Sequence, residues 1–202
     1  SEGEIAAMDI NQVDEFLKLN KDNKKQNLLS LVSLAKQACN NGVVRTHIVD
    51  AKLDGVLPCE IFSDLGSGTM IYTSNYGKLR AMEQTDIPSV LSMMKPFVES
   101  GKILPRTNED LLINLSDYVV YEFDGGIHAC SALHVYPDGQ AEIGAVVVDE
   151  NFAHIGIGPK MMDYLISKAK EEKVKSIFIM TTQSADWFEK LGFVPDTIES
   201  LP

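Results

Sequence analysis

The stretch VDENFAHIGIGPK, which runs from Val148 to Lys160, decides the fold class of the C-terminal part of this chain. It leaves a continuous apolar run, passes through Gly156 and Gly158, and enters a segment with helical spacing of apolar residues. Glycine lets the backbone approach a ligand closely, and the free amides of a helix's first turn bind anions such as a pyrophosphate. Taken alone, a G-x-G turn before a helix is more often a plain tight turn, so the neighbouring elements must decide.

The segment after the turn is expected to form a helix, a strand and a second helix. Apolar residues between 161 and 169 share one side of the first helix. A strand is expected at 176–181 and a short helix at 184–191, which Gly192 ends. An extended Phe193-Val194 segment closes this order of elements.

The segment before the turn predicts three consecutive strands, at 118–123, 127–136 and 141–148. Asp124-Gly125-Gly126 joins the first pair and Pro137-Asp138-Gly139 joins the second, and both have the chemistry of hairpin turns. We therefore expect an antiparallel meander. Helical spacing predicts two helices ahead of it, at residues 86–98 and 108–115.

The N-terminal part shows its own alternation of helices and strands. Its elements are expected at residues 27–39 (helix), 46–49 (strand), 53–62 (helix) and 66–72 (glycine turn and strand). The polar stretch 73–77 predicts a linker, so we place the domain boundary between residues 76 and 77. The two predicted domains are 1–76 and 77–202.

Composition narrows the class of protein. The 202-residue chain has a formal net charge of -11 and no cluster of Lys and Arg, which argues against a nucleic-acid partner. Cys39, Cys59 and Cys130 lack paired spacing, which favours a reducing compartment over a disulfide scaffold or a metal site. The sequence has no signal peptide pattern and no stretch long enough to span a bilayer. We interpret the protein as cytoplasmic, without a membrane partner and without a metal.

The order strand, glycine turn, long helix, strand, short helix and Gly-Phe resembles the GNAT acetyltransferase superfamily. The resemblance implies an α/β fold with a mixed, mostly antiparallel sheet flanked by helices, and acetyl-CoA as co-substrate. Ala153 stands where the superfamily has Arg or Gln, so the phosphates would be bound by the backbone. The splayed strand before the turn would pair with the pantetheine arm. The cofactor-binding residues implied are Val146, Val147, Val148, Ala153, His154, Ile155, Gly156, Ile157, Gly158 and Lys160.

A closer resemblance rests on Glu142-Ile143-Gly144 and on the run from Thr181 to Phe193, TTQSADWFEKLGF. Together with the final Leu201-Pro202, these motifs are similar to the acetyltransferase domain of bacterial N-acetylglutamate synthases. The similarity runs from about Arg80 to the last residue. It implies L-glutamate as acceptor, a place at the start of arginine biosynthesis, and compatibility with a homo-oligomer.

The N-terminal part resembles the end of the amino-acid kinase domain that precedes the acetyltransferase domain in these synthases. The similar segments are Gly42–Ile48, Glu60–Phe62 and Gly66–Ile71. We expect residues 1–76 to be a remnant of that α/β fold, and Ser1–Asp9 to include an internal strand. In the family the stretch matching Glu60–Gly68 contributes to an arginine-feedback site, which we do not expect to be intact in this chain.

Acyl transfer to an amine needs a neutral nucleophile and a proton for the departing thiolate. Glu142 is the candidate general base, and an exposed strand charge is the equally weighted alternative. Phe188 stands where many relatives carry a tyrosine acid, so water would protonate the thiolate. A Cys130 and His134 nucleophile pair is rejected, because residues four apart on a strand lie too far apart. His154 either contacts a cofactor phosphate or is a solvated loop histidine.

A dicarboxylate acceptor needs cationic partners. The resemblance assigns Arg80 and Arg106 to the substrate, with Gln183 and Ser184 beside them. Gln183 stands where the bacterial synthases commonly carry Arg, and Asp117 where a Lys is expected. The alternatives are an acyltransferase for another amino acid or for another donor such as succinyl-CoA, and a non-catalytic CoA-sensing subunit.

Overall fold

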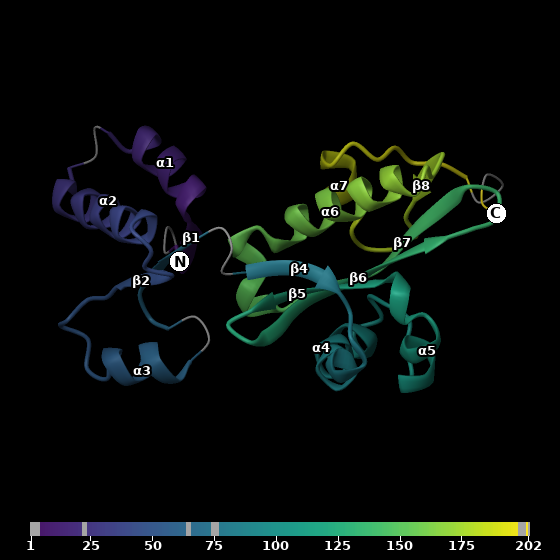
Figure 1. Ribbon diagram of the computed structural model, residues 1–202, viewed down its shortest axis with the longest axis horizontal. Helices are drawn as coiled ribbons and strands as arrows, with labels where there is room; N and C mark the ends of the chain where they lie inside the picture. The colour runs from purple at the N-terminus through teal and green to yellow at the C-terminus, as the bar shows by residue number, and fades with distance from the viewer. Residues whose placement is uncertain (1–4, 22–23, 64–65, 74–76, 198–200, 202) are drawn as a thin grey trace. The chain divides into compact units, whose positions relative to one another are not determined.

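The computed structural model describes residues 5–21, 24–63, 66–73, 77–197 and 201, with the backbone but not the side chain of His154. The chain forms two compact units, Ser1–Gly77 and Lys78–Pro202, each with its own sheet (Figure 1). Most of the linker predicted at 73–77, residues 74–76, lies outside the described residues.

The first unit packs two helices against a three-stranded sheet of order β1-β3-β2. The first pair is parallel and the second antiparallel. Leu29, Val32, Ala35 and Cys39 form the buried stripe of the helix predicted at 27–39, whereas Leu28 and Leu31, expected on the same apolar face, are exposed. The elements are β1 (Ala7–Asp9), α1 (Ile10–Leu19), α2 (Gln26–Asn40), β2 (Arg45–Ile48), α3 (Val56–Phe62) and β3 (Thr69–Tyr72).

The second unit contains the predicted meander inside a five-stranded sheet of order β4-β5-β6-β7-β8. The sheet is mixed, because β5–β6 and β6–β7 are antiparallel and β7–β8 is parallel. Its strands are β4 (Gly77–Ala81), β5 (Tyr118–Phe123), β6 (Gly126–Val135), β7 (Gln140–Val148) and β8 (Ser176–Phe178). Its helices are η1 (Gln84–Asp86), α4 (Ile87–Glu99), α5 (Asn108–Ile113), η2 (Leu115–Asp117), η3 (Glu150–Ile155), α6 (Ile157–Glu171) and α7 (Ala185–Lys190).

Helices cover both faces of this sheet. Figure 1 shows α4 and α5 on one face and α6 and α7 on the other. On the α4 face, Val90 and Met94 pack with Cys130 and Val147 in one buried cluster. On the other face, the apolar stripe predicted for 161–169 is buried on α6. A sheet covered on both faces explains why β7 ends in an uninterrupted apolar run.

One strand departs from its prediction. β8 was expected to continue to residue 181, but it ends at Phe178, where its pairing with Glu142 of β7 is the last of the register. β7 continues to Val148 and bulges: its register with β6 shifts between Cys130 and Ala132, and Ala145 has a φ of 50°. Because a bulge bends and twists its strand, β7 diverges from β8 beyond this point.

Candidate active site

A cleft of about 420 Å³ opens where β7 and the segment after β8 diverge. Ligand pockets commonly enclose about 300 to 1,000 Å³, so this volume suits a small-molecule site. One side consists of β7 from Ile143 to Val148, and the other of the segment 179–184 with α7. The end of α4 and the residues after it close the cleft. The lining residues are Phe97, Lys102, Ile103, Ile143, Gly144, Ala145, Val146, Val148, Ile179, Met180, Thr181, Gln183, Ser184, Trp187 and Phe188.

The β7 edge that faces the cleft is not paired with β8 beyond Glu142 in the described sheet. An unpaired strand edge offers N–H and C=O groups to an extended ligand. Val146 and Val148, which are predicted cofactor contacts, line the cleft. The Val147 side chain instead lies in the core against α4, so this residue has only its backbone to offer a cofactor.

The glycine turn follows β7 and leads into α6. Gly156 adopts a φ of 77° as the residue before α6, a left-handed conformation that strains any residue with a Cβ. Ile155 and Ile157 are buried, so their side chains pack in the core and only their backbone is available to a phosphate. Ala153 is exposed in η3, and the side chain of His154 lies outside the described residues.

Glu142 lies on the α4 face of the sheet, opposite His134 on β6. Its Oε2 accepts a hydrogen bond from the Tyr136 hydroxyl at 3.1 Å. A Cβ added to Gly144, which lines the cleft, would come within 3.3 Å of Glu142 Oε1. The carboxylate therefore lies beside the cleft, where it is available to take a proton from an amine or through a water.

The pairing of Cys130 with His134 is absent, as expected. Cys130 is fully buried, and this burial raises the pKa of its thiol to about 12, which leaves no thiolate near neutral pH. His134 instead makes a 2.7 Å hydrogen bond through Nδ1 with Asp117. A covalent cysteine mechanism has no support in this arrangement.

Arg80, expected to bind substrate, does not line the cleft. Its guanidinium binds both oxygens of Asp86, at 2.6 and 2.9 Å, and Glu122 at 2.6 Å. These contacts hold the pKa of both carboxyls below their ordinary values. Two carboxylates pair with this cation, so Arg80 fixes β4 to β5 and η1, and its contact with substrate stays a prediction.

Arg106 also has protein partners. Its Nη1 donates to the carbonyls of Leu104 and Pro105, at 3.4 and 3.2 Å. Burial raises the pKa of Tyr118, and a hydrogen bond between its hydroxyl and Arg106 opposes that shift. Arg106 thus lies beside the cluster of Tyr118, Asp117 and His134, outside the cleft lining.

The segment after β8 provides the neutral polar side chains of the cleft. Gln183 and Ser184, both expected at the substrate, line it together with Thr181. Phe188, at the position of the missing tyrosine acid, presents a ring without a hydroxyl. Sequence reasoning missed Lys102, because it lies between elements in a polar loop without a motif of its own.

A family model described as "Acetyltransferase (GNAT) family" matches residues 87–193, which is more than half of the chain. The chain belongs to this family. In this GNAT domain the cleft lies along the β7 edge and its bulge, and the glycine turn follows β7 into α6.

Amino-acid acetyltransferases are among the curated relatives of this GNAT chain. The protein from Azotobacter vinelandii is 34% identical over 173 residues, 85% of this chain and 40% of the relative. The protein from Aliivibrio fischeri is 35% identical over 169 residues, 83% of this chain and 38% of the relative. This chain therefore spans about 40% of the length of the relatives it matches.

A solved relative aligns with both units. N-acetylglutamate synthase from Neisseria gonorrhoeae, complexed with coenzyme A and N-acetyl-glutamate, is 26% identical with a TM-score of 0.62. The alignment covers 100% of this chain and 47% of the synthase, so it extends beyond the GNAT domain into the N-terminal unit.

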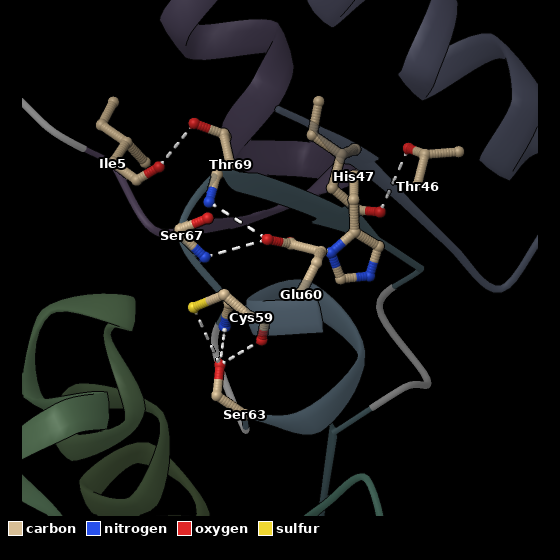
Figure 2. Close-up of polar contacts among 11 residues, drawn as sticks. Ile5, Thr46, His47, Cys59, Glu60, Ser63, Ser67 and Thr69 are labelled. Atoms are coloured by element: carbon tan, nitrogen blue, oxygen red, sulfur yellow. Dashed lines mark hydrogen bonds and ion pairs between the residues drawn. The ribbon is translucent and has the colours of Figure 1, made fainter. Parts of the chain in front are cut away.

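The N-terminal unit holds a polar cluster of its own around Glu60 (Figure 2). The carboxylate accepts hydrogen bonds from the Ser67 and Gly68 amides, at 2.9 and 3.3 Å, and pairs with His47 Nδ1. Burial acts to raise the pKa of Glu60, but the bonds from Ser67 and His47 outweigh it and hold the pKa low. The cluster thereby ties α3 to the start of β3 and to β2.

Two further points concern the helices and the potential metal-binding side chains in the described part of the chain. No helix there is both long and apolar enough to cross a bilayer. No group of three or more His, Cys, Asp or Glu side chains gathers there in a way that would hold a metal ion.

Proposed function

We propose that this chain transfers the acetyl group of acetyl-CoA to the α-amino group of L-glutamate, as an N-acetylglutamate synthase at the first step of arginine biosynthesis. The observation that carries the proposal is the unpaired β7 edge beside Glu142, which opens a cleft bounded by the Thr181–Phe188 segment. The curated relatives are amino-acid acetyltransferases, and the gonococcal synthase binds coenzyme A and N-acetyl-glutamate.

The cofactor fits this site through backbone groups. The β7 edge from Ile143 to Val148 would pair with the amides of the pantetheine arm, and the first turn of α6 after Gly156 would bind the pyrophosphate. When bound, acetyl-CoA supplies an activated acyl carbonyl. The exposed Ala153 leaves this binding to the backbone, with Lys160 in the same first turn as the nearest cation of the motif.

Glu142 would remove a proton from the acceptor amine, directly or through a water, as the amine nitrogen bonds to the acyl carbon. The carbon–sulfur bond then breaks, and water gives the thiolate its proton because Phe188 has none to offer. The Tyr136 hydroxyl donates a hydrogen bond to Oε2 of Glu142 and thereby holds the carboxylate. General-base catalysis of this kind contributes about a hundredfold or more to the rate.

One observation favours another acceptor. Gln183 is neutral where the bacterial synthases commonly carry Arg, and Arg80 is engaged by Asp86 and Glu122. An acyltransferase for a different amino acid, or with a donor such as succinyl-CoA, would fit a cleft with fewer cations. A non-catalytic CoA-sensing subunit would bind CoA in this cleft without catalysing acyl transfer.

Thiol release from acetyl-CoA with a panel of amino acids distinguishes these functions. We expect glutamate to give the highest kcat/KM and N-acetylglutamate as the product by mass. If Glu142 is the general base, the size-matched variant Glu142→Gln should lose most of the turnover and still bind CoA. Faster thiol release with another amino acid or acyl donor would indicate the alternative acyltransferase. CoA binding without any thiol release would indicate the CoA-sensing subunit.

A further inference from the structure

The cleft contains a cation that neither the motifs nor the family resemblance assigned. Lys102 is the one charged side chain among the lining residues that the structure describes. The polar groups around it, on Thr181, Gln183 and Ser184, are neutral. A negative charge entering the cleft would therefore find its electrostatic partner at this position.

Lys102 is held at the cleft by the end of α4. Its amide donates to the Phe97 carbonyl at 2.9 Å, after a reversal of the chain at Gly101, whose φ is 68°. Its Nζ lies 5.5 Å from the centroid of the Phe97 ring, and Phe97 also lines the cleft. No carboxylate of the described residues forms an ion pair with it, in contrast to Arg80.

The location indicates which ligand this ammonium would meet. Phe97 and Ile103, its neighbours, pack on the same buried cluster as Ala145, the bulge residue of β7. The bulge marks the region beside Gly144 and Glu142, where the acyl carbon and the amine must meet in the proposed reaction. The phosphates would bind at the other end of the β7 edge, after Val148, at the turn that begins α6.

We infer that Lys102 binds a carboxylate of the acceptor amino acid and thereby makes the cleft selective for amines that carry a carboxylate. The inference rests on the proposed acetyl transfer and adds the residue that determines its specificity. The Lys102 ammonium would hold the acceptor's carboxylate away from Glu142. The acceptor's amine would then be directed towards Glu142. Lys102 takes a role that sequence reasoning gave to Arg80.

Lys102→Met, which keeps the unbranched side chain up to the Cε position and removes the charged ammonium, tests the inference. We expect the KM for glutamate to rise about tenfold to a hundredfold, the range for loss of a charged hydrogen bond, with kcat within about twofold. CoA affinity, followed by the emission of Trp187, the single tryptophan of the chain and a cleft residue, should not change. Lys95→Met is the matched control, because Lys95 lies on α4 outside the cleft lining and pairs with Glu99.

Glutamine, compared with glutamate, shows which carboxylate is bound. If Lys102 binds the γ-carboxylate, the variant loses its preference for glutamate over glutamine; if it binds the α-carboxylate, both KM values rise together. Both results support the inference. An unchanged KM for glutamate, or a loss confined to CoA affinity, would overturn it while acetyl transfer stands. A wild-type chain that neither binds nor acetylates glutamate would overturn the proposed function as well.

Discussion

The indole of Trp187 lies so close to Gly158 that a Cβ on this glycine would come within 3.1 Å of the indole Cζ2. The contact joins α7 to the first turn of α6, so one wall of the cleft rests on the element that starts the phosphate-binding helix. Trp187 therefore restricts position 158 to a very small residue, whether or not a ligand also approaches this glycine.

Gly158→Val should displace Trp187 towards the cleft and weaken CoA binding. Such a contact distance is shorter than ordinary van der Waals contact, and valine adds two further methyl groups. We expect a shifted Trp187 emission and a CoA affinity lower by about tenfold, measured by calorimetry, since forced overpacking typically costs about 1 to 3 kcal/mol. Gly158→Ala should give a smaller change in the same direction. A folded Gly158→Val protein with unchanged emission and affinity would contradict this account.

Periodicity and turn chemistry predicted the meander and the long helices of the second unit but not its edge strand β4. The hairpin turns at Gly125-Gly126 and Asp138-Gly139 set the meander, because short turns of this type leave adjacent strands antiparallel. The early end of β8 was not predictable. Ile179 and Met180 are as apolar as a strand requires, and only the bulge at Ala145, one strand away, removes their pairing partner.

The Arg80 cluster should stabilise the fold in a pH-dependent way. Asp86 and Glu122 have folded pKa values below their ordinary ones, so the pairs stabilise fully above the unfolded pKa values, near 4. That stabilisation is lost as the pH falls through the folded values. Arg80→Met should lower the free energy of unfolding by about 1 to 3 kcal/mol at pH 7, and the difference should shrink below pH 4. Urea denaturation over a pH series measures it.

Lys78→Met is the control for that experiment. Lys78 approaches Glu122 at 3.6 Å with a side chain that is 59% exposed, and exposed pairs contribute little. A destabilisation as large as that of Arg80→Met, or one independent of pH, would refute the assigned role. A change in the KM for glutamate alone would return Arg80 to the substrate.

Tyr136 should position the Glu142 carboxylate without being essential. Tyr136→Phe keeps the ring stacked on Phe178, with centroids 5.9 Å apart, and removes the hydrogen bond to Oε2. We expect kcat to fall by about threefold to tenfold, because a less ordered base spends less time in the reactive geometry, against about a hundredfold or more for Glu142→Gln. Equal losses in both variants, or none in Glu142→Gln, would show that the carboxylate has a different role.

Arginine should inhibit this chain little by itself. In the family the stretch matching Glu60–Gly68 contributes to an arginine site, and here the Glu60 carboxylate is already satisfied by His47 and by the Ser67 and Gly68 amides. Turnover measured with rising arginine should stay flat, with lysine as the charge-matched control. Saturable inhibition by arginine but not by lysine would contradict this prediction.

Site residues that follow one another on a single strand were predictable from the sequence. Residues whose role depends on side chains distant in the sequence were not. Val146 and Val148 were expected on the strand that precedes the glycine turn, and they line the cleft. The ion pairs of Arg80 were not predictable, because nothing in its motif reveals that Glu122, forty-two positions away, accepts a hydrogen bond from it. Lys102 was missed because it has no motif of its own, and only the structure shows that it lines the cleft without an ion pair to any described carboxylate.

Gln183→Arg should tighten the binding of glutamate. Gln183 lies in the segment between β8 and α7, and it lines the same cleft as Lys102, which comes from the end of α4. A guanidinium would add a second cation to a site with one, and a charged hydrogen bond contributes about 1 kcal/mol or more beyond a neutral one, or roughly a tenfold lower KM for glutamate. Steady-state thiol release measures this, and Gln183→Met is the size-matched control without a charge. In the Lys102→Met background the same change should restore part of the lost affinity, because either cation can pair with the acceptor's carboxylate. If Gln183→Arg leaves the KM for glutamate unchanged while a neutral amino acid keeps the higher kcat/KM, the cleft does not select anionic acceptors, and the acyltransferase for a different amino acid takes the place of the synthase.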